Sequence, residues 1–185
     1  MRPLATLILA VALSACAGPS PSGPSPSGAA PSDSPVCIPS ASPSPDANAV
    51  TALLPACVNG VTTDRREIGV GNRNSPRIFL KVVARVAKSP PDAEVGLAFG
   101  SNATIYAVRI DGLSGDEVLQ AYLAERMGVP AGSAPPSFPT EDVGGKQAIK
   151  IGATAGGFLY ASADAFFYLD CPDEPTAADV LSQLP

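Results

Sequence analysis

Histidine and tryptophan are both absent from this chain of 185 residues. The absence of histidine excludes Ser-His-Asp and Cys-His catalysis, metal sites with histidine ligands and haem bound through histidine. Charged residues make up only 16% of the sequence, and 17 acidic residues against 12 basic ones give a net charge of -5. An acidic chain has little attraction for a phosphate backbone, so we expect no nucleic acid partner.

Motifs that carry catalytic chemistry are missing as well. Without histidine a serine nucleophile would need a lysine base, and neither GxSxG nor SxxK occurs beyond residue 45. The adjacent carboxylates Asp116/Glu117 and Asp173/Glu174 fall at expected helix starts, where acidic side chains favour the helix dipole. The cysteines show no CxxC spacing and make a poor metal site. The sequence therefore predicts a protein that is not an enzyme and holds no cofactor or metal.

Proline and glycine are frequent, with 21 and 17 residues, but they are unevenly distributed. Residues 17–35 contain six prolines and six serines, no aromatic residue and no aliphatic residue larger than alanine. Such a segment cannot bury a core and favours extended polyproline II, with a reach on the order of 60 Å at ~3.1 Å per residue. We expect residues 16–45 to be a disordered tether and residues 46–185 to form one folded domain.

The first fifteen residues have the pattern of an export signal. Arg2 precedes a nearly all-apolar stretch, Leu4 to Leu13, which is too short to span a bilayer. The residues Leu13-Ser14-Ala15-Cys16 resemble the lipobox of bacterial lipoproteins. The resemblance implies that residues 1–15 are removed as a signal peptide and that the Cys16 thiol is lipidated. Two or more acyl chains, such as palmitate, hold a protein firmly on a membrane.

This resemblance implies an exported protein whose lipid holds it on the outer face of the bacterial cell membrane, or in the periplasm or outer membrane of a Gram-negative organism. The membrane is then its expected partner. No later stretch reaches ~18 apolar residues, so we expect no second membrane segment. Without residues 1–15 the chain has 11 basic and 17 acidic residues, a net charge of -6. Anionic lipid headgroups should repel such a body weakly.

Apolar spacing from residue 46 onward predicts helices mixed with strands. Helices are expected after Asp46, after Ser75-Pro76, after a capping box at Ser114 and Glu117, and at Thr176. Strands are expected at 60–70, 95–100, 103–110, 146–151, 157–161 and 165–170. Short turns favour antiparallel pairing, so we predict a two-layer α+β domain. It has about six antiparallel strands and helices on one face.

Two segments of equal length, 96–123 and 157–184, share the order strand, tight turn, aromatic strand and capped helix. This pattern indicates two pseudo-repeats. Leu54-Pro55 and Leu184-Pro185 resemble the opening and the ending of uncharacterised small lipoprotein domains of bacterial cell envelopes. That resemblance implies a broad layout and carries no activity with it.

Three cysteines remain beyond Cys16, and an oxidising location would allow one disulfide among them. A Cys37–Cys57 bridge would flank the first expected helix, attach the tether to the domain and contribute about 3 kcal/mol. A Cys57–Cys171 bridge would join the two pseudo-repeats. The first pairing is slightly favoured, and both stay open.

One loop combines glycines with arginines ahead of an expected helix start, and it is the candidate anion-binding site: Gly69, Gly71, Arg73 and Arg77. The third glycine of a dinucleotide fingerprint and the lysine of a P-loop are missing from it. A second candidate is an aromatic group, more typical of a core, that could line a pocket: Phe158, Tyr160, Phe166, Phe167 and Tyr168.

These features favour a lipid-anchored envelope protein with a non-enzymatic binding or structural role. The alternative is an anchored carrier of a small apolar or anionic ligand. Neither a protein partner nor a specific ligand is indicated. A void of roughly a few hundred Å³ between the sheet and its helices would favour the carrier, whereas a filled interface would favour the first role.

Overall fold

The structure is a computed structural model that describes residues 37, 49–73, 75–86, 93–135, 137–152 and 157–185. The described residues belong to one unit, Asp33–Pro185. The signal segment, the lipidation site Cys16 and the expected helix cap Asp46 lie outside the described residues. Within the described part, no helix is both long and apolar enough to cross a membrane.

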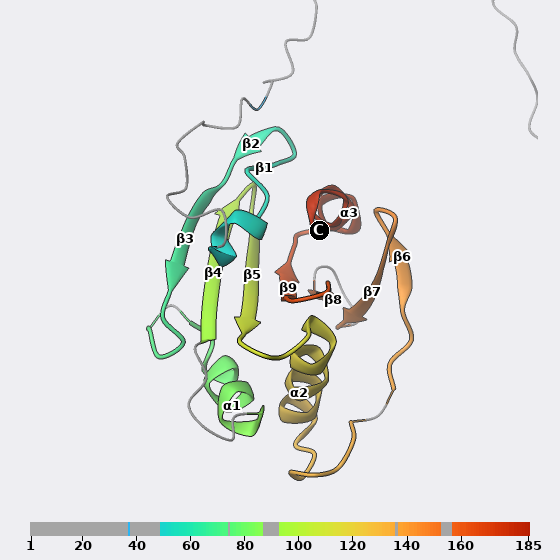
Figure 1. Ribbon diagram of the computed structural model, residues 1–185. Helices are drawn as coiled ribbons and strands as arrows, with labels where there is room; N and C mark the ends of the chain where they lie inside the picture. Colours follow the sequence, from blue (N-terminus) through green and yellow to red (C-terminus); the bar gives the residue numbers. More distant parts are fainter. Residues whose placement is uncertain (1–36, 38–48, 74, 87–92, 136, 153–156) are drawn as a thin grey trace, which may run out of the picture. The chain divides into compact units, whose positions relative to one another are not determined.

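Seven antiparallel strands form the central sheet, in the order β3-β4-β5-β9-β8-β7-β6 (Figure 1). Their bounds are β3 Asp64–Ile68, β4 Ala93–Gly100, β5 Ala103–Ile110, β6 Glu141–Val143, β7 Lys146–Ile151, β8 Gly157–Ala161 and β9 Phe166–Asp170. The predicted α+β class with a large antiparallel sheet is confirmed. Within this sheet, the strand that was not predicted is β6, which has three residues.

The expected strand at 60–70 is divided between two sheets. Its first part, β2 (Val61–Thr62), pairs with β1 (Cys57–Val58) in a separate two-stranded ribbon, and its second part is β3. Asn59 and Gly60 form the two-residue turn of this ribbon, both with positive φ. An Asn-Gly pair is the preferred sequence for such a turn because both residues tolerate that conformation. The Asn59 side chain donates a hydrogen bond of 2.9 Å to Thr176 Oγ1, which fastens the ribbon to the last helix.

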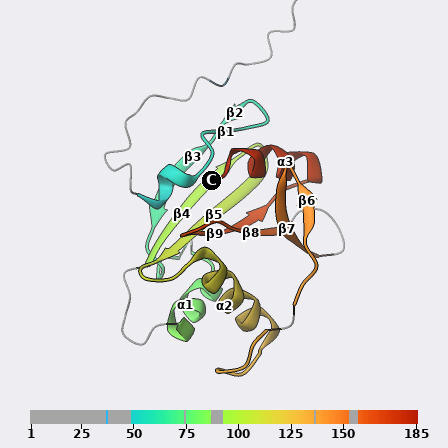
Figure 2. The ribbon, with the colours of Figure 1, turned by 45° about the vertical axis from the view of Figure 1, so that its right-hand side comes forward.

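Helices lie on both faces of the sheet, which corrects the expectation that they cover one face (Figure 2). On one face pack α1 (Arg77–Val86) and α2 (Gly115–Met127). On the other face pack α3 (Glu174–Gln183) and the 3-10 helix η1 (Val50–Leu53). The sheet is therefore the middle layer of the fold rather than one of two layers.

The physical reason is visible along β5. Ile105 and Ala107 belong to the core beneath α3, whereas Val108 and Ile110 belong to the core beneath α1 and α2. All four side chains are at most 1% exposed. Because successive side chains point to opposite faces, a strand that is apolar at both sets of positions must be covered on both sides.

The two pseudo-repeats share an element order but not an arrangement. Their hairpins, β4–β5 and β8–β9, meet in the middle of the sheet through the β5–β9 pair. However, the helix after β5 packs on one face and the helix after β9 packs on the other. Position for position, Tyr106 corresponds to Phe167, and the two side chains lie in opposite cores.

Of the three expected helix caps that fall on described residues, one is confirmed. The capping box at α2 is confirmed, with hydrogen bonds between Ser114 and Glu117 in both directions. α3 is capped by Asp173, whose carboxylate accepts from the Thr176 N–H at 2.8 Å, so Thr176 is not the cap that was expected. Ser75 does not cap α1. Its Oγ is buried without a hydrogen-bond partner among the described residues.

Cys37 and Cys57 form a disulfide with their Cα atoms 6.2 Å apart, which confirms the favoured pairing. Cys171 is a free thiol, 3% exposed, in the core beneath α3. The alternative Cys57–Cys171 bridge is therefore wrong. Burial, with added repulsion from Asp170 and Asp173, raises the pKa of the Cys171 thiol to about 12, so it stays protonated at neutral pH.

Candidate functional site: a pocket lined by three tyrosines

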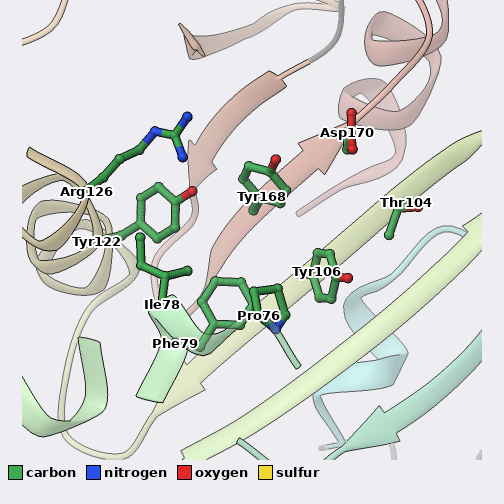
Figure 3. Close-up of a pocket in the computed structure, with 9 residues that line it drawn as sticks. All are labelled: Pro76, Ile78, Phe79, Thr104, Tyr106, Tyr122, Arg126, Tyr168 and Asp170. Carbon is green, nitrogen blue, oxygen red and sulfur yellow. The ribbon is translucent and has the colours of Figure 1, made fainter. Parts of the chain in front are cut away.

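A pocket of about 320 Å³ opens on the face of the sheet that α1 and α2 cover (Figure 3). We call it the tyrosine pocket, because three of the four tyrosines of the chain line it. Its wall comes from the start of α1, from β5, from α2 and from β9. The lining residues are Pro76, Ile78, Phe79, Thr104, Tyr106, Tyr122, Arg126, Tyr168 and Asp170.

The backbone explains why these side chains converge. Thr104 lies opposite Asp170 and Tyr106 lies opposite Tyr168 in the β5–β9 register. Because side chains alternate along a strand, all four point to the same face of the sheet. On α2, Tyr122 and Arg126 are four residues apart and so lie on the same side of the helix.

Four aromatic rings form a closed cycle in the pocket wall. Ring centroids are separated by 5.5 Å from Phe79 to Tyr106, 6.0 Å from Tyr106 to Tyr168, 6.0 Å from Tyr168 to Tyr122 and 6.2 Å from Tyr122 back to Phe79. These separations suit favourable aromatic pairs. Since each ring comes from a different element, the cycle holds α1 and α2 against the two central strands and gives the pocket a packed wall.

Exposure is graded across the pocket. Phe79 and Tyr122 are only 1% and 2% exposed, Tyr106 and Tyr168 are half-buried, and Arg126 and Asp170 are exposed. The pocket thus has an apolar floor, a middle zone of phenol groups and a charged rim. Such a gradient allows a ligand to keep its charged groups near solvent while its body contacts the rings.

Burial perturbs all three phenols in the same direction. Desolvation raises the pKa of Tyr122 to about 12, an effect that the nearby Arg126 guanidinium partly opposes. Desolvation, reinforced by the negative charge of Asp170, also raises the pKa of Tyr106 and of Tyr168. At neutral pH the three phenols are therefore protonated, and each can both donate and accept a hydrogen bond.

The two charged residues of the pocket have opposite signs. In Figure 3, Arg126 lies beside Tyr122, and Asp170 lies on the far side of Tyr168. Neither Arg126 nor Asp170 makes an ion pair with a described residue. The ion pairs among the described residues join Arg85 to Glu125, Arg109 to Glu94 and Asp164, and Lys150 to Glu174.

A second hollow of about 330 Å³ adjoins the first. It is lined by Arg66, Leu97, Phe99, Thr104 and Tyr106. Because Thr104 and Tyr106 line both hollows, the depression continues across β5 toward β4. The Arg66 guanidinium carbon lies 5.1 Å from the centre of the Phe99 ring, a cation–π contact that occupies the outer end of this hollow.

The candidate anion-binding loop lies next to the tyrosine pocket. Pro76 lines the pocket, whereas Arg73 and Arg77 are exposed and do not. The Asn72 N–H donates to the Gly69 carbonyl at 2.8 Å, and the Ser75 N–H donates to the Asn72 carbonyl at 3.0 Å. Two amides of the loop are thus used within it.

Nothing in the backbone of this loop requires its glycines. Neither Gly69 nor Gly71 has a positive φ, and a Cβ at either position would meet nothing within 4 Å. Anion binding by this loop stays a prediction.

The expected aromatic group is separated by the fold. Phe158 and Phe167 lie in the core beneath α3, and Phe166 lies in the core beneath α1 and α2. Only Tyr168 of this group lines the tyrosine pocket, while Tyr160 lines a separate hollow together with Asp116 and Leu119 of α2. Sequence analysis missed Tyr106, Tyr122, Arg126 and Asp170. The sequence signal that could have found them was the spacing of polar or phenolic side chains. These are two residues apart on β5 and on β9, and four residues apart on α2.

In the part of the chain that the structure describes, no group of three or more histidine, cysteine, aspartate or glutamate side chains could hold a metal ion. Comparison with family models, curated proteins and solved structures finds no match for this chain.

Proposed function

We propose that the protein is an exported lipoprotein, anchored through Cys16, whose domain binds a small ligand in the tyrosine pocket. The observation that carries the binding role is the pocket itself, about 320 Å³ with phenol, hydroxyl and charged groups converging on it. Small-molecule sites are typically concave and apolar, with a few polar groups that orient the ligand. A purely structural domain would instead fill the space between its sheet and its helices.

The chemistry of the pocket favours binding over catalysis. Phenols whose pKa is raised are poor general bases at neutral pH, because they hold their protons. The pocket also contains one carboxylate, Asp170, where glycoside hydrolysis commonly uses two. The role that fits these groups is non-covalent recognition.

The N-terminal features support an extracytoplasmic location. The apolar segment, the lipobox resemblance at Cys16 and the proline-rich stretch follow one another in the order of a signal, an anchor and a spacer. The Cys37–Cys57 disulfide agrees with this location, because disulfides persist in oxidising compartments.

The anchor is tested by Cys16→Ala. We expect the variant to leave the membrane fraction while the domain keeps its circular dichroism spectrum, because anionic lipid headgroups should repel an acidic body weakly. Wild-type protein carrying acyl chains in its mass spectrum is the matched control. A variant that stays wholly in the membrane fraction after a high-salt wash, with its signal peptide removed, would contradict the lipid anchor.

The binding role is tested by tyrosine fluorescence. The chain has no tryptophan, so its intrinsic emission comes from four tyrosines. Tyr160→Phe removes the tyrosine outside the pocket and makes every remaining emitter a pocket residue. Probes are choline, acetate, inorganic phosphate, glucose, glycine betaine and phosphocholine. We expect at least one to change the emission and to show saturable binding by calorimetry, and Tyr168→Ala to abolish both. If no probe binds, the pocket is not a site for these ligand classes and the proposal fails.

A further inference from the structure

Resting on that proposed function, we infer that the tyrosine pocket takes a small zwitterion. Its ammonium group lies at Asp170, and its carboxylate or phosphate group lies at Arg126. The observation behind this inference is a pair of opposite charges that line one pocket without an ion-pair partner among the described residues. The two charged side chains come from different elements, Arg126 from α2 and Asp170 from β9. Here the tyrosine rings lie between them (Figure 3).

Adjacent residues on α2 have different partners: Glu125 is paired away from the pocket, whereas Arg126 lines it. Glu125 pairs with Arg85 at 3.0 Å, and Arg85 also donates to the carbonyls of Val129 and Pro130, at 2.8 Å each. Glu125 is thus engaged with α1. Arg126, one residue further on, lines the pocket and makes a hydrogen bond with the Tyr122 side chain.

The cationic end of the ligand belongs at Asp170. Asp170 lies two residues beyond Tyr168 on the same face of β9, and its negative charge contributes to the raised pKa of both Tyr106 and Tyr168. Thr104 adds a hydroxyl directly opposite Asp170 in the strand register. An ammonium group there would meet a carboxylate and aromatic rings, and aromatic rings attract cations through their π faces.

The anionic end belongs at Arg126. Its guanidinium makes a hydrogen bond with the Tyr122 side chain, and in Figure 3 the rings of Tyr122 and Tyr168 separate Arg126 from Asp170. A guanidinium presents parallel N–H donors that match a carboxylate or a phosphate, and such charge-assisted hydrogen bonds are strong. Protonated phenols nearby supply further donors to the same anionic group.

Both ends are needed for selectivity. A simple anion bound at Arg126 would be repelled by Asp170, and a simple cation at Asp170 would be repelled by Arg126. A zwitterion pairs with Arg126 and Asp170 at the same time. The side chain that repels a singly charged ligand therefore attracts the other end of a zwitterion. The volume of about 320 Å³ restricts the ligand to a small molecule.

The experiment measures dissociation constants by calorimetry on the full-length protein in a maltoside detergent. The zwitterionic probes are phosphocholine and glycine betaine, and the others are choline, acetate, inorganic phosphate and glucose. We expect at least one zwitterion to bind ten or more times more tightly than every other probe. Preference for phosphocholine indicates a phosphate group such as a lipid headgroup carries, and preference for glycine betaine indicates a free carboxylate solute.

Two charge-removing variants locate the binding. Asp170→Asn and Arg126→Gln should each weaken the zwitterion about tenfold or more. The matched controls Asp142→Asn and Lys81→Gln, which change exposed residues outside the pocket, should alter binding less than twofold. Because Asp170 and Arg126 are exposed, their variants should keep the wild-type circular dichroism spectrum.

Three results would overturn the inference: singly charged probes that bind as tightly as the zwitterions, zwitterion binding that survives both charge variants, or glucose binding without zwitterion binding. In each case the tyrosine pocket remains a ligand site if Tyr168→Ala abolishes the binding that is seen. If no probe binds at all, the proposed function and the zwitterion inference fail together.

Discussion

Tyr106 on β5 and Tyr168 on β9 lie directly opposite each other in the sheet, with their ring centroids 6.0 Å apart. This pairing puts residues from two distant parts of the chain into one pocket wall. It depends on strand register, because a slip of one residue would turn each side chain to the opposite face. The register is held by apolar neighbours on both faces, such as Val108 and Phe167.

Tyr122 should make the stability of the domain sensitive to alkaline pH. The pKa of tyrosine is about 10 in an unfolded chain, and burial raises that of Tyr122 to about 12 in the folded protein. At a pH between these two pKa values, the Tyr122 phenol loses its proton in the unfolded state and keeps it in the folded state. The stabilisation is therefore complete below about pH 10 and falls as the pH rises toward about 12. Urea unfolding at about pH 9 and about pH 11 measures this loss. Tyr122→Phe should show a shallower decline, and an unchanged decline would rule out Tyr122 as its source.

The disulfide should contribute substantially to stability. Breaking the Cys37–Cys57 bridge frees a loop with a sequence separation of 20 residues, and we expect the free energy of unfolding to fall by about 3 kcal/mol. Urea unfolding of the Cys37→Ser/Cys57→Ser double variant measures this change. Wild-type protein in reducing agent should match the variant. Equal stability with and without reducing agent would show that the bridge does not form in solution.

Cys171 should be protected from modification as long as the protein is folded. Its side chain is 3% exposed, and burial raises the pKa of its thiol to about 12, so the reactive thiolate is scarce at neutral pH. Iodoacetamide should label it slowly in native protein and fast in urea, as followed by mass spectrometry. Rapid labelling of the native protein would mean that α3 opens readily from the sheet.

Gly115, at the start of α2, should not tolerate a larger residue. A Cβ at this position would lie 2.2 Å from the Ala165 carbonyl oxygen and 2.3 Å from that of Ser162. These are backbone atoms that cannot move without disturbing the turn before β9. We expect Gly115→Ala to reduce the free energy of unfolding by about 3 kcal/mol. In contrast, Gly69→Ala should be nearly neutral, since a Cβ there has no neighbour within 4 Å. Similar thermal unfolding of the two variants would contradict the close packing at Gly115.

Local features of the fold could be predicted from the sequence. The capping box at Ser114 and the β4–β5 hairpin depend on residues close together in the chain. The Asn59-Gly60 turn was an equally local signal for the β1–β2 ribbon, which the expected strand at 60–70 did not reveal.

The face on which each helix packs could not be predicted in the same way, because it depends on the sheet as a whole. The apolar residues on both sides of β5 were the evidence that two layers of helices would be required. The tyrosine pocket was hidden for a related reason. Tyr106, Tyr122 and Tyr168 are unremarkable in their own segments, and only the strand order and the position of α2 bring them together.

The Cys37–Cys57 bridge also determines how tension would travel through an anchored chain. If the chain is anchored as proposed, a pull from the membrane would reach Cys37 and pass through the two sulfur atoms to Cys57 at the start of β1. The stretch between them, which includes η1, is bypassed and carries no force. Val50, a fully buried residue of the core beneath α3, is therefore shielded from mechanical stress. Strain from the anchor instead enters at a two-stranded ribbon that Asn59 ties to α3.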